Sequence, residues 1–184
     1  MRCFITFCFI LLLSACQAPQ LNRFTVNTMA DMRPIVLKVN DVQIKSEIMK
    51  YDRLPHIEEK LPISPEDALT EWAENRFYGA DKLAHTDVVI TIRNAYMVQK
   101  EELGTNWYTL DNDAYKLTYE VNMAFVQNNS VLYQHTVTGW ESSSLPQRSS
   151  MADKEAIWQK MMNAMIRKVN KQLTESVPDV FKVR

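Results

Sequence analysis

Cysteine and glycine are both scarce in this chain of 184 residues. The three cysteines, Cys3, Cys8 and Cys16, lie at the N-terminal end, so the rest of the chain has no disulfide, thiol nucleophile or thiolate metal ligand. The three glycines stand far apart in the sequence. No glycine-rich loop can therefore place converging N–H groups around a phosphate. These shortages argue against thiol chemistry, cysteine metal sites and phosphate-loop nucleotide binding.

An excess of basic residues is also missing. The chain holds 21 Lys and Arg against 22 Asp and Glu, for a formal net charge of −1, and no stretch is rich in Lys and Arg. Nucleic-acid binding needs basic side chains that neutralise phosphates, and docking on anionic lipid needs a basic cluster near the membrane. We therefore predict no nucleic-acid partner and no electrostatic docking on lipid.

The sequence pattern contains no grouping typical of catalysis or metal binding. His56, His85 and His135 are far apart, and no two of them form the i, i+4 pair of a helical metal site. The serines of Ser142–Ser144 have no positioned base, which favours a flexible loop over a nucleophile. We predict no catalytic residue, no metal site and no cofactor, and expect that the protein is not an enzyme.

The most apolar segment of the chain is at its N-terminus, where Arg2 precedes an apolar run from Phe4 to Leu13. This run is shorter than the about 20 residues that span a bilayer, and small residues end it, which is the layout of a secretory signal. The ending Leu13-Ser14-Ala15-Cys16 resembles a bacterial lipobox. In that family the cysteine receives a diacylglyceryl group, the signal is cleaved before it, and the new N-terminus is acylated.

This resemblance implies a cellular location for the protein and a division of the chain into segments. Residues 1–15 would be a lipoprotein signal peptide, and Cys16 would carry the lipid, including acyl chains such as palmitate, that holds the protein on a membrane. Residues 16–34 would form a tether, and residues 35–184 a single domain. Gln17 stands where an Asp would signal inner-membrane retention, which looks like sorting to the outer membrane, facing the periplasm. An ordinary cleaved signal and an uncleaved anchor are the alternatives.

The sequence pattern in the first half of the domain predicts one strand and one helix. Residues 35–48 read as a strand with a bulge or turn at Asn40-Asp41, and residues 49–63 as an extended loop. Ser64 is a suitable N-cap and Pro65 a suitable first residue for the helix. The helix has an apolar face at 3.6-residue spacing and a plausible stop at Gly79. This face holds Leu69, Trp72, Ala73, Arg76 and Phe77.

The second half predicts three strands and a long helix. Residues 87–99 alternate from Val88 through Tyr96 and Val98, and residues 114–127 alternate from Tyr115 to Phe125. Asn128-Asn129-Ser130 forms a turn, from which residues 131–141 return as a strand, followed by a loop over Ser142 to Ser150. The last helix covers residues 153–176 and ends before Pro178.

These elements predict an α+β fold in the order β-α-β-β-β-α. The economical arrangement is an antiparallel sheet of about four strands with both helices packed on one face. The other face would carry polar residues and be open to solvent or a partner. These residues include Lys116, Thr118, Glu120 and Asn122.

Aromatic and methionine side chains suggest an apolar cleft between the sheet and the C-terminal helix. Ordinary core packing is the alternative interpretation of the same residues. The candidate cleft residues are Trp72, Phe77, Tyr119, Trp158, Met161 and Met165.

Several short runs resemble an uncharacterised group of small alphaproteobacterial envelope lipoproteins, across roughly residues 35–180. These runs are Leu61–Ala68, Trp72-Ala73, Arg76-Phe77, Val88–Ile90 and Glu155–Trp158. The predicted element order is also similar to that of auxiliary lipoproteins of envelope ABC transport systems. That second resemblance is one of topology only, and topology does not set function.

Three functions follow as hypotheses. The first is a non-enzymatic, lipid-anchored periplasmic binding or adaptor module that binds an envelope protein, as an auxiliary of a transport or assembly system. The second is a carrier or sensor of an apolar ligand, such as a lipid, held between the sheet and the C-terminal helix. The third is an envelope hydrolase. A hydrolytic activity that is lost when Glu71, Glu74 or His135 is changed would indicate this function.

Overall fold

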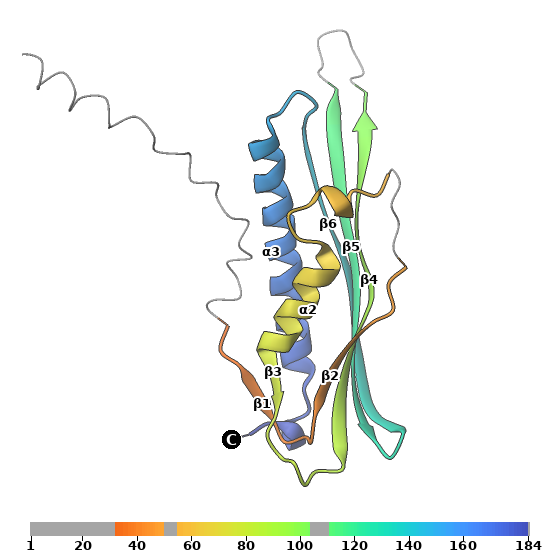
Figure 1. Ribbon diagram of the computed structural model, residues 1–184, viewed down its shortest axis with the longest axis vertical. Coiled ribbons are helices and arrows are strands. Elements are labelled where there is room, and N and C mark those ends of the chain that lie inside the picture. Colours follow the sequence, from red (N-terminus) through yellow and green to blue (C-terminus); the bar gives the residue numbers. More distant parts are fainter. Residues whose placement is uncertain (1–31, 50–54, 104–110, 184) are drawn as a thin grey trace, which may run out of the picture.

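The computed structural model describes residues 32–49, 55–103 and 111–183. The predicted signal peptide, Cys16 and most of the tether lie outside these residues. The described part has an α+β fold with two α-helices, a four-stranded sheet and a two-stranded sheet (Figure 1). The predicted fold class is therefore confirmed, although the predicted order and sheet type are not.

The four-stranded sheet has the order β2-β4-β5-β6, with β2 parallel to β4 and the remaining pairs antiparallel. The expectation of a fully antiparallel sheet is therefore wrong. The reason is the connection between β2 and β4, which contains helix α2, because such a crossover returns the chain in the same direction. The strands are β2 (Val42–Ser46), β4 (Thr86–Glu102), β5 (Asn112–Gln127) and β6 (Ser130–Pro146).

The two-stranded sheet pairs β1 (Ile35–Leu37) with β3 (Phe77–Gly79) in parallel. The expected strand over residues 35–48 is thus two strands, which separate at the expected irregularity around Asn40-Asp41. Strand β3 was not expected, and it changes the element order to β-β-α-β-β-β-β-α. Gly79 allows β3 to approach this bend, because a Cβ there would lie 2.9 Å from the carbonyl oxygen of Val39.

Helix α2 (Pro65–Arg76) begins as predicted, with the Ser64 hydroxyl accepting a hydrogen bond of 3.0 Å from the N–H of Asp67. It ends earlier than predicted, because Phe77 has an extended backbone and belongs to β3. Helix α3 (Met151–Ser176) confirms the predicted C-terminal helix, and a capping box between Ser150 and Asp153 sets its start. Short 3-10 turns, η2 (Glu58–Lys60) and η3 (Asp179–Phe181), precede α2 and follow α3.

A β-bulge in β4 changes which residues face the helices. The register shifts between Ile92 and Asn94, so Ala95 and Met97 are buried after the bulge. The predicted continuation of the buried face through Tyr96 and Val98 is therefore wrong, since both side chains point to the opposite face. In β5 the predicted alternation from Tyr115 to Phe125 is confirmed without interruption.

The β5–β6 hairpin is longer than predicted. Asn128 and Asn129 form its turn with positive φ angles of 47° and 63°, which asparagine tolerates better than most residues. Strand β6 continues to Pro146, so the serines at 142–144 belong to a strand and the loop predicted there is wrong. The register explains this, because β5 begins at Asn112 and supplies pairing partners for these serines.

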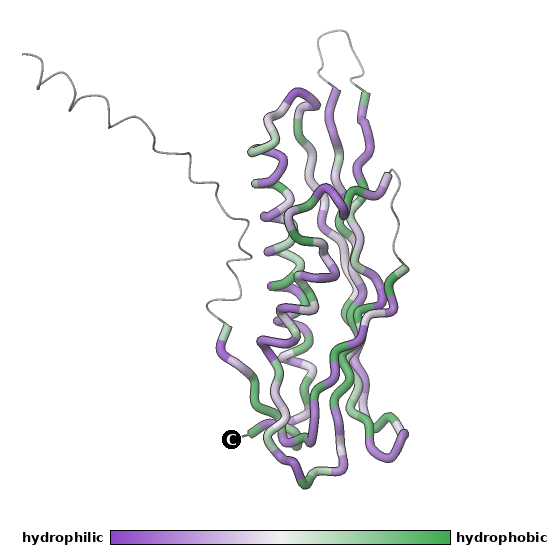
Figure 2. Tube along the Cα trace, in the orientation of Figure 1, coloured by the Kyte–Doolittle hydropathy of each residue, from purple (hydrophilic) through white to green (hydrophobic). Residues whose placement is uncertain are grey.

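Both helices pack on one face of the four-stranded sheet and enclose the core (Figure 1). Apolar and polar residues alternate along the helices and strands, which lets each element bury one side (Figure 2). Trp72 of α2 and Met162 and Met165 of α3 are almost fully buried against the inward residues of the strands. The inner face of the sheet is thereby closed, and the outer face is left without a helix.

Candidate functional site

The outer face of the four-stranded sheet is covered by neither of the two helices (Figure 1). Strand pairing places its residues in rows that cross β4, β5 and β6. Tyr96, Thr118 and Trp140 form one such row, and Val98, Lys116 and Ser142 form the next. The outer face therefore combines aromatic rings, hydroxyl groups and charges, unlike the apolar inner face.

A hollow of about 1030 Å³ lies on this face. Its floor comes from β4, β5 and the C-terminal half of β6, and its wall from residues on both sides of the 50–54 segment, namely Glu47–Met49 and Pro55-His56. The lining carries charges of both signs. The charged residues are Glu47, Arg93, Lys100, Glu101, Glu102 and Lys116.

Backbone pairing to the edge of β4 holds the wall in position. The N–H of Ile57 donates to the carbonyl of Met97 at 3.0 Å, and the N–H of Gln99 donates to the carbonyl of Pro55 at 2.8 Å. The N–H of Met97 donates to Glu58 Oε1 at 2.8 Å, and His56 Nδ1 lies 3.2 Å from the same oxygen. The residues of the wall thus extend the sheet by pairing with the edge of β4.

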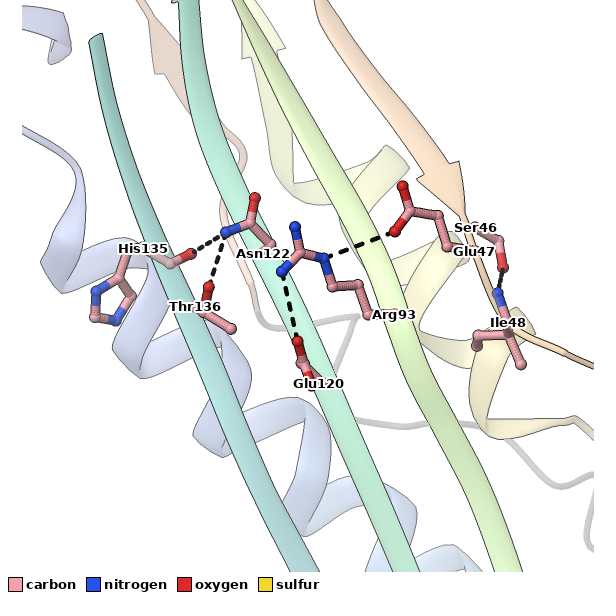
Figure 3. Close-up of polar contacts among 8 residues, drawn as sticks. All are labelled: Ser46, Glu47, Ile48, Arg93, Glu120, Asn122, His135 and Thr136. Carbon is pink, nitrogen blue, oxygen red and sulfur yellow. Dashed lines mark hydrogen bonds and ion pairs between the residues drawn. The ribbon is translucent and has the colours of Figure 1, made fainter. Parts of the chain in front are cut away.

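Arg93 occupies the bulge of β4 and connects two acidic side chains across the outer face. Its guanidinium lies 3.7 Å from Glu47 Oε2 and 3.6 Å from Glu120 Oε1 (Figure 3). Arg93 and Glu47 are 44% and 63% exposed, so each ion pair contributes only about 0–1 kcal/mol to stability. These charges can exchange partners at little cost to the fold, which suits them to binding.

Asn122 joins β5 to β6 beneath this network. Its Nδ2 donates to Thr136 Oγ1 at 2.8 Å and lies 3.4 Å from the backbone oxygen of His135 (Figure 3). Asn122 is only 4% exposed although it lies on the uncovered face. This cross-strand contact keeps the floor of the face rigid where Arg93 spans it.

Trp140 presents the largest exposed apolar side chain of the outer face, with 59% of its surface accessible. The Lys116 ammonium lies 5.6 Å from the centre of its ring, within the range of a cation–π contact. Beside them, Thr118 Oγ1 is buried without a hydrogen-bond partner among the described residues. An exposed tryptophan surrounded by polar groups is typical of residues that dominate binding interfaces.

A second, smaller hollow of about 350 Å³ lies between η2, the start of α2 and β4. Its lining combines acidic and apolar residues, and it shares Ile48, Met49 and Tyr96 with the lining of the larger hollow. The acidic residues are Glu58, Glu59, Glu66 and Asp67.

The six predicted cleft residues all lie in the core, each at most 4% exposed. Trp72 contacts Phe77 edge to face with ring centres 5.6 Å apart, and Trp158 contacts Tyr115 in the same way at 5.8 Å. Neither of the two hollows is lined by any of the six. An apolar ligand between sheet and helix stays a prediction, as does the lipidation of Cys16.

Two tyrosines and an aspartate on the inner face have displaced pKa values. Burial, followed by the charge of Asp113, raises the pKa of Tyr115 to about 12. Burial, followed by Glu141, raises the pKa of Tyr119 to about 12. Burial acts to raise the pKa of Asp113, but hydrogen bonds, first from Lys154, lower it below its ordinary value. These shifts keep the tyrosines neutral and the aspartate charged, which indicates structural roles.

Metal sites and membrane-spanning helices can be assessed only among the residues that the structure describes. Among them, no three or more His, Cys, Asp and Glu side chains form a group that could hold a metal ion. Neither helix in the described ranges is long and apolar enough to cross a bilayer. Sequence reasoning named Lys116, Thr118 and Glu120 on the open face but missed Arg93 and the wall, because the bulge and the edge pairing depend on contacts distant in sequence.

No family model and no curated protein matches this chain. Solved structures are similar at low identity. A minor lipoprotein from Acinetobacter baumannii has 8% identity and a TM-score of 0.45, with 79% of this chain and 96% of that chain covered. A proposed neuraminyllactose-binding hemagglutinin homologue from Helicobacter pylori has 11% identity and a TM-score of 0.49, with 80% and 90% covered.

The rare lipoprotein B from Shewanella oneidensis is also similar, with 12% identity, a TM-score of 0.41 and coverage of 74% of this chain and 96% of that chain. The similar structures thus include bacterial lipoproteins. At these identities and TM-scores, we base no functional conclusion about this chain on them.

Proposed function

We propose that this protein is a lipid-anchored lipoprotein of the bacterial cell envelope and acts as a non-enzymatic binding module. The lipobox-like ending Leu13-Ser14-Ala15-Cys16 supports the anchor, and Gln17 supports the outer membrane as its location. Lipidation with two or more acyl chains holds a protein on a bilayer stably, because each buried methylene contributes about 0.8 kcal/mol.

The observation that carries the binding role is the hollow on the uncovered sheet face. Its charges of both signs, together with the exposed Trp140 beside its lining residues Lys116 and Thr118, fit a protein segment that offers charges, hydrogen-bonding groups and an apolar contact. The Arg93 ion pairs are solvent-exposed, so a partner carboxylate can replace Glu47 or Glu120 without a large loss of stability. The partner is therefore an envelope protein that docks on the outer face.

Crosslinking in cells, followed by affinity purification of the full-length chain, tests this proposal. We expect a reproducible partner with the unchanged chain and loss of that partner with Cys16→Ala, which would remove the lipid attachment. We also expect Trp140→Ala to reduce recovery of the partner by about tenfold, which corresponds to 1.4 kcal/mol of binding.

Glu74→Ala is the matched control, because Glu74 is exposed on the polar side of α2 and far from the outer face. It should leave recovery of the partner unchanged. Equal recovery with Trp140→Ala and with the unchanged chain would contradict binding at the outer face. Lipid that copurifies with the chain, in the absence of any protein partner, would favour the apolar-ligand hypothesis instead.

A further inference from the structure

The two sides of the four-stranded sheet differ in how much of their backbone is paired with other parts of the chain. At the β4 edge, β2 pairs with the first half of the strand and residues 55–57 pair with the second half. Between them, the N–H of Glu47 donates to the carbonyl of Ile92 at 2.9 Å, and the Glu58 carboxylate accepts the N–H of Met97. Partners within the chain thus cover much of the outer side of β4, and the edge strand β2 on this side has only five residues.

The opposite edge is formed by β6, and it has no such cover. Across residues 32–49, 55–103 and 111–183, β6 has β5 as its one strand neighbour. Helix α3 packs on the inner face of the sheet and supplies no backbone partner to the edge. Strand β6 has seventeen residues, and the backbone groups that point away from β5, on about every second residue, are therefore available for pairing.

Strand β6 also lacks most of the features that normally prevent edge pairing, apart from the inward-facing charge of Glu141. Proteins protect exposed edges with lysine, proline, short strands or bulges. This strand contains no Lys or Arg, its one proline is the last residue, Pro146, and its bulge lies beside the turn. Glu141 is its one acidic residue and His135 its one histidine. An edge of this length and composition is suited to pair with another strand.

We infer that β6 pairs in antiparallel orientation with β6 of a second copy of this chain, about a two-fold axis at Thr138. In this register, Glu141 and His135 lie equally far from the axis on either side, so Glu141 of each copy faces His135 of the other. Trp140 faces Thr136, and Gly139 faces Val137. An acidic residue thereby meets a hydrogen-bond donor, and an aromatic residue meets a β-branched one, both of which are favourable cross-strand pairs.

The charges nearby favour this register over one with its axis at Glu141. A two-fold axis at Glu141 would place the two carboxylates opposite one another, which is destabilising. With the axis at Thr138, the carboxylate of Glu141 keeps its ion pair with Lys168 of its own α3 and gains His135 of the second copy. Both Glu141 and His135 lie in the inward-facing register of β6, opposite Leu117 and Met123 of β5. The complementarity of β6 with itself argues for a second copy as the occupant.

This inference does not depend on the proposed partner surface. Residues opposite one another in an antiparallel pair share a face, so the two outer faces would form one continuous surface. Each copy would keep its own hollow, because the hollow's wall lies at the β4 edge and its β6 residues, Ser142–Ser144, lie to one side of the two-fold axis.

Disulfide trapping of the full-length chain in membranes tests the pairing. The engineered thiol of Thr138→Cys would face itself across the axis at a Cα separation of about 4.5–5.5 Å, which a disulfide can span. We expect a disulfide-linked dimer under mild oxidation. The unchanged chain reveals any crosslink through the native cysteines Cys3, Cys8 and Cys16.

Glu120→Cys is the matched control, because Glu120 is the β5 partner of Thr138 on the same face. Two such thiols would be about 14 Å apart across three strand spacings, too far for a disulfide. We expect no dimer from this variant. A crosslink yield for Thr138→Cys no higher than for Glu120→Cys, or a crosslink to a different protein, would overturn the inference.

Thr138→Lys provides a second test that keeps the fold intact, since Thr138 is exposed. Two ammonium groups would then face one another at the axis, and lysine is a common means of blocking edge pairing. We expect the dimer of the purified full-length chain to dissociate at least about tenfold more readily by light scattering, with an unchanged circular dichroism spectrum. A monomeric unchanged chain would also overturn the inference and would leave residues 16–31 or another protein as the occupant of the edge.

Discussion

The two faces of the four-stranded sheet are made from alternate residues of the same strands, yet they differ in almost every property. Leu117 is fully buried beneath the helices, while its neighbour Lys116 lies on the exposed face above Trp140. Ion pairs differ in the same way, since Asp113 is 3% exposed on the inner face and Glu47 is 63% exposed on the outer one. The inner face stabilises the fold, and the outer face is free to change without unfolding it.

The largest effect is expected from a core truncation. Leu117→Ala should lower the free energy of unfolding by about 2–5 kcal/mol, because it removes buried methyl groups and leaves a cavity. Lys116→Ala, one residue away on the other face, should cost no more than about 1 kcal/mol, the usual limit for an exposed cation–π contact. Urea unfolding of the two purified variants measures the difference. Similar losses from both would contradict the division of the two faces.

The next largest effect concerns the buried ion pair between Lys154 and Asp113, whose Nζ and Oδ2 lie 2.9 Å apart. Lys154→Met should cost on the order of 2 kcal/mol at pH 7, because it leaves a buried carboxylate without its cation. The pKa of Asp113 is lowered in the folded state, so this stabilisation is present above the unfolded pKa and is lost as pH falls through the folded pKa.

Urea unfolding of the unchanged chain and Lys154→Met between pH 7 and pH 2 checks the sign of this dependence. The gap in stability between the two proteins should narrow as Asp113 becomes protonated. A gap that widens toward low pH would show that the carboxylate is not the group stabilised by Lys154.

A loss of comparable size is expected at Gly139, where β6 passes the ring of Tyr119 on the inner face. A Cβ at this position would lie under 3.0 Å from several atoms of that ring. Gly139→Ala should therefore destabilise the fold by about 1–3 kcal/mol, as overpacking does. Thr138→Ala on the outer face is the adjacent control and should change the melting temperature little. Equal melting temperatures for both variants would indicate that Tyr119 moves aside freely.

The smallest effect on stability is expected from Arg93→Ala. Its two ion pairs are long and exposed, so the free energy of unfolding should change by about 0.5 kcal/mol or less. Partner recovery in the pull-down should nevertheless fall, because the proposed binding surface loses its central cation. A large loss of stability would show that Arg93 belongs to the fold rather than to a binding surface.

Elements whose signal is local in the sequence were predicted well. The alternation of β5, the Ser64 cap and the C-terminal helix α3 each depend on neighbouring residues, and each has its expected place. The open outer face followed from the same alternation, since the polar residues between Tyr115 and Phe125 had to lie opposite the helices.

Elements that depend on distant contacts were not predicted. The parallel pairing of β2 depends on β4, and the short strand β3 exists because Phe77–Gly79 lies beside β1. The bulge at Arg93 inserts a residue that alternation alone cannot reveal, and it turned the buried positions from Tyr96 and Val98 to Ala95 and Met97. The wall of the hollow was missed for the same reason, because its pairing to β4 leaves no periodic pattern.

The two-residue turn at Asn128-Asn129 has a consequence for the order in which the chain acquires its structure. It joins strands of 16 and 17 residues by the shortest of connections, so their pairing loses little loop entropy and should form early. The pairing of β2 with β4 joins Val42 to Val88 and must close a much longer loop. We expect pulsed hydrogen exchange during refolding to protect the hairpin amides before those of β2.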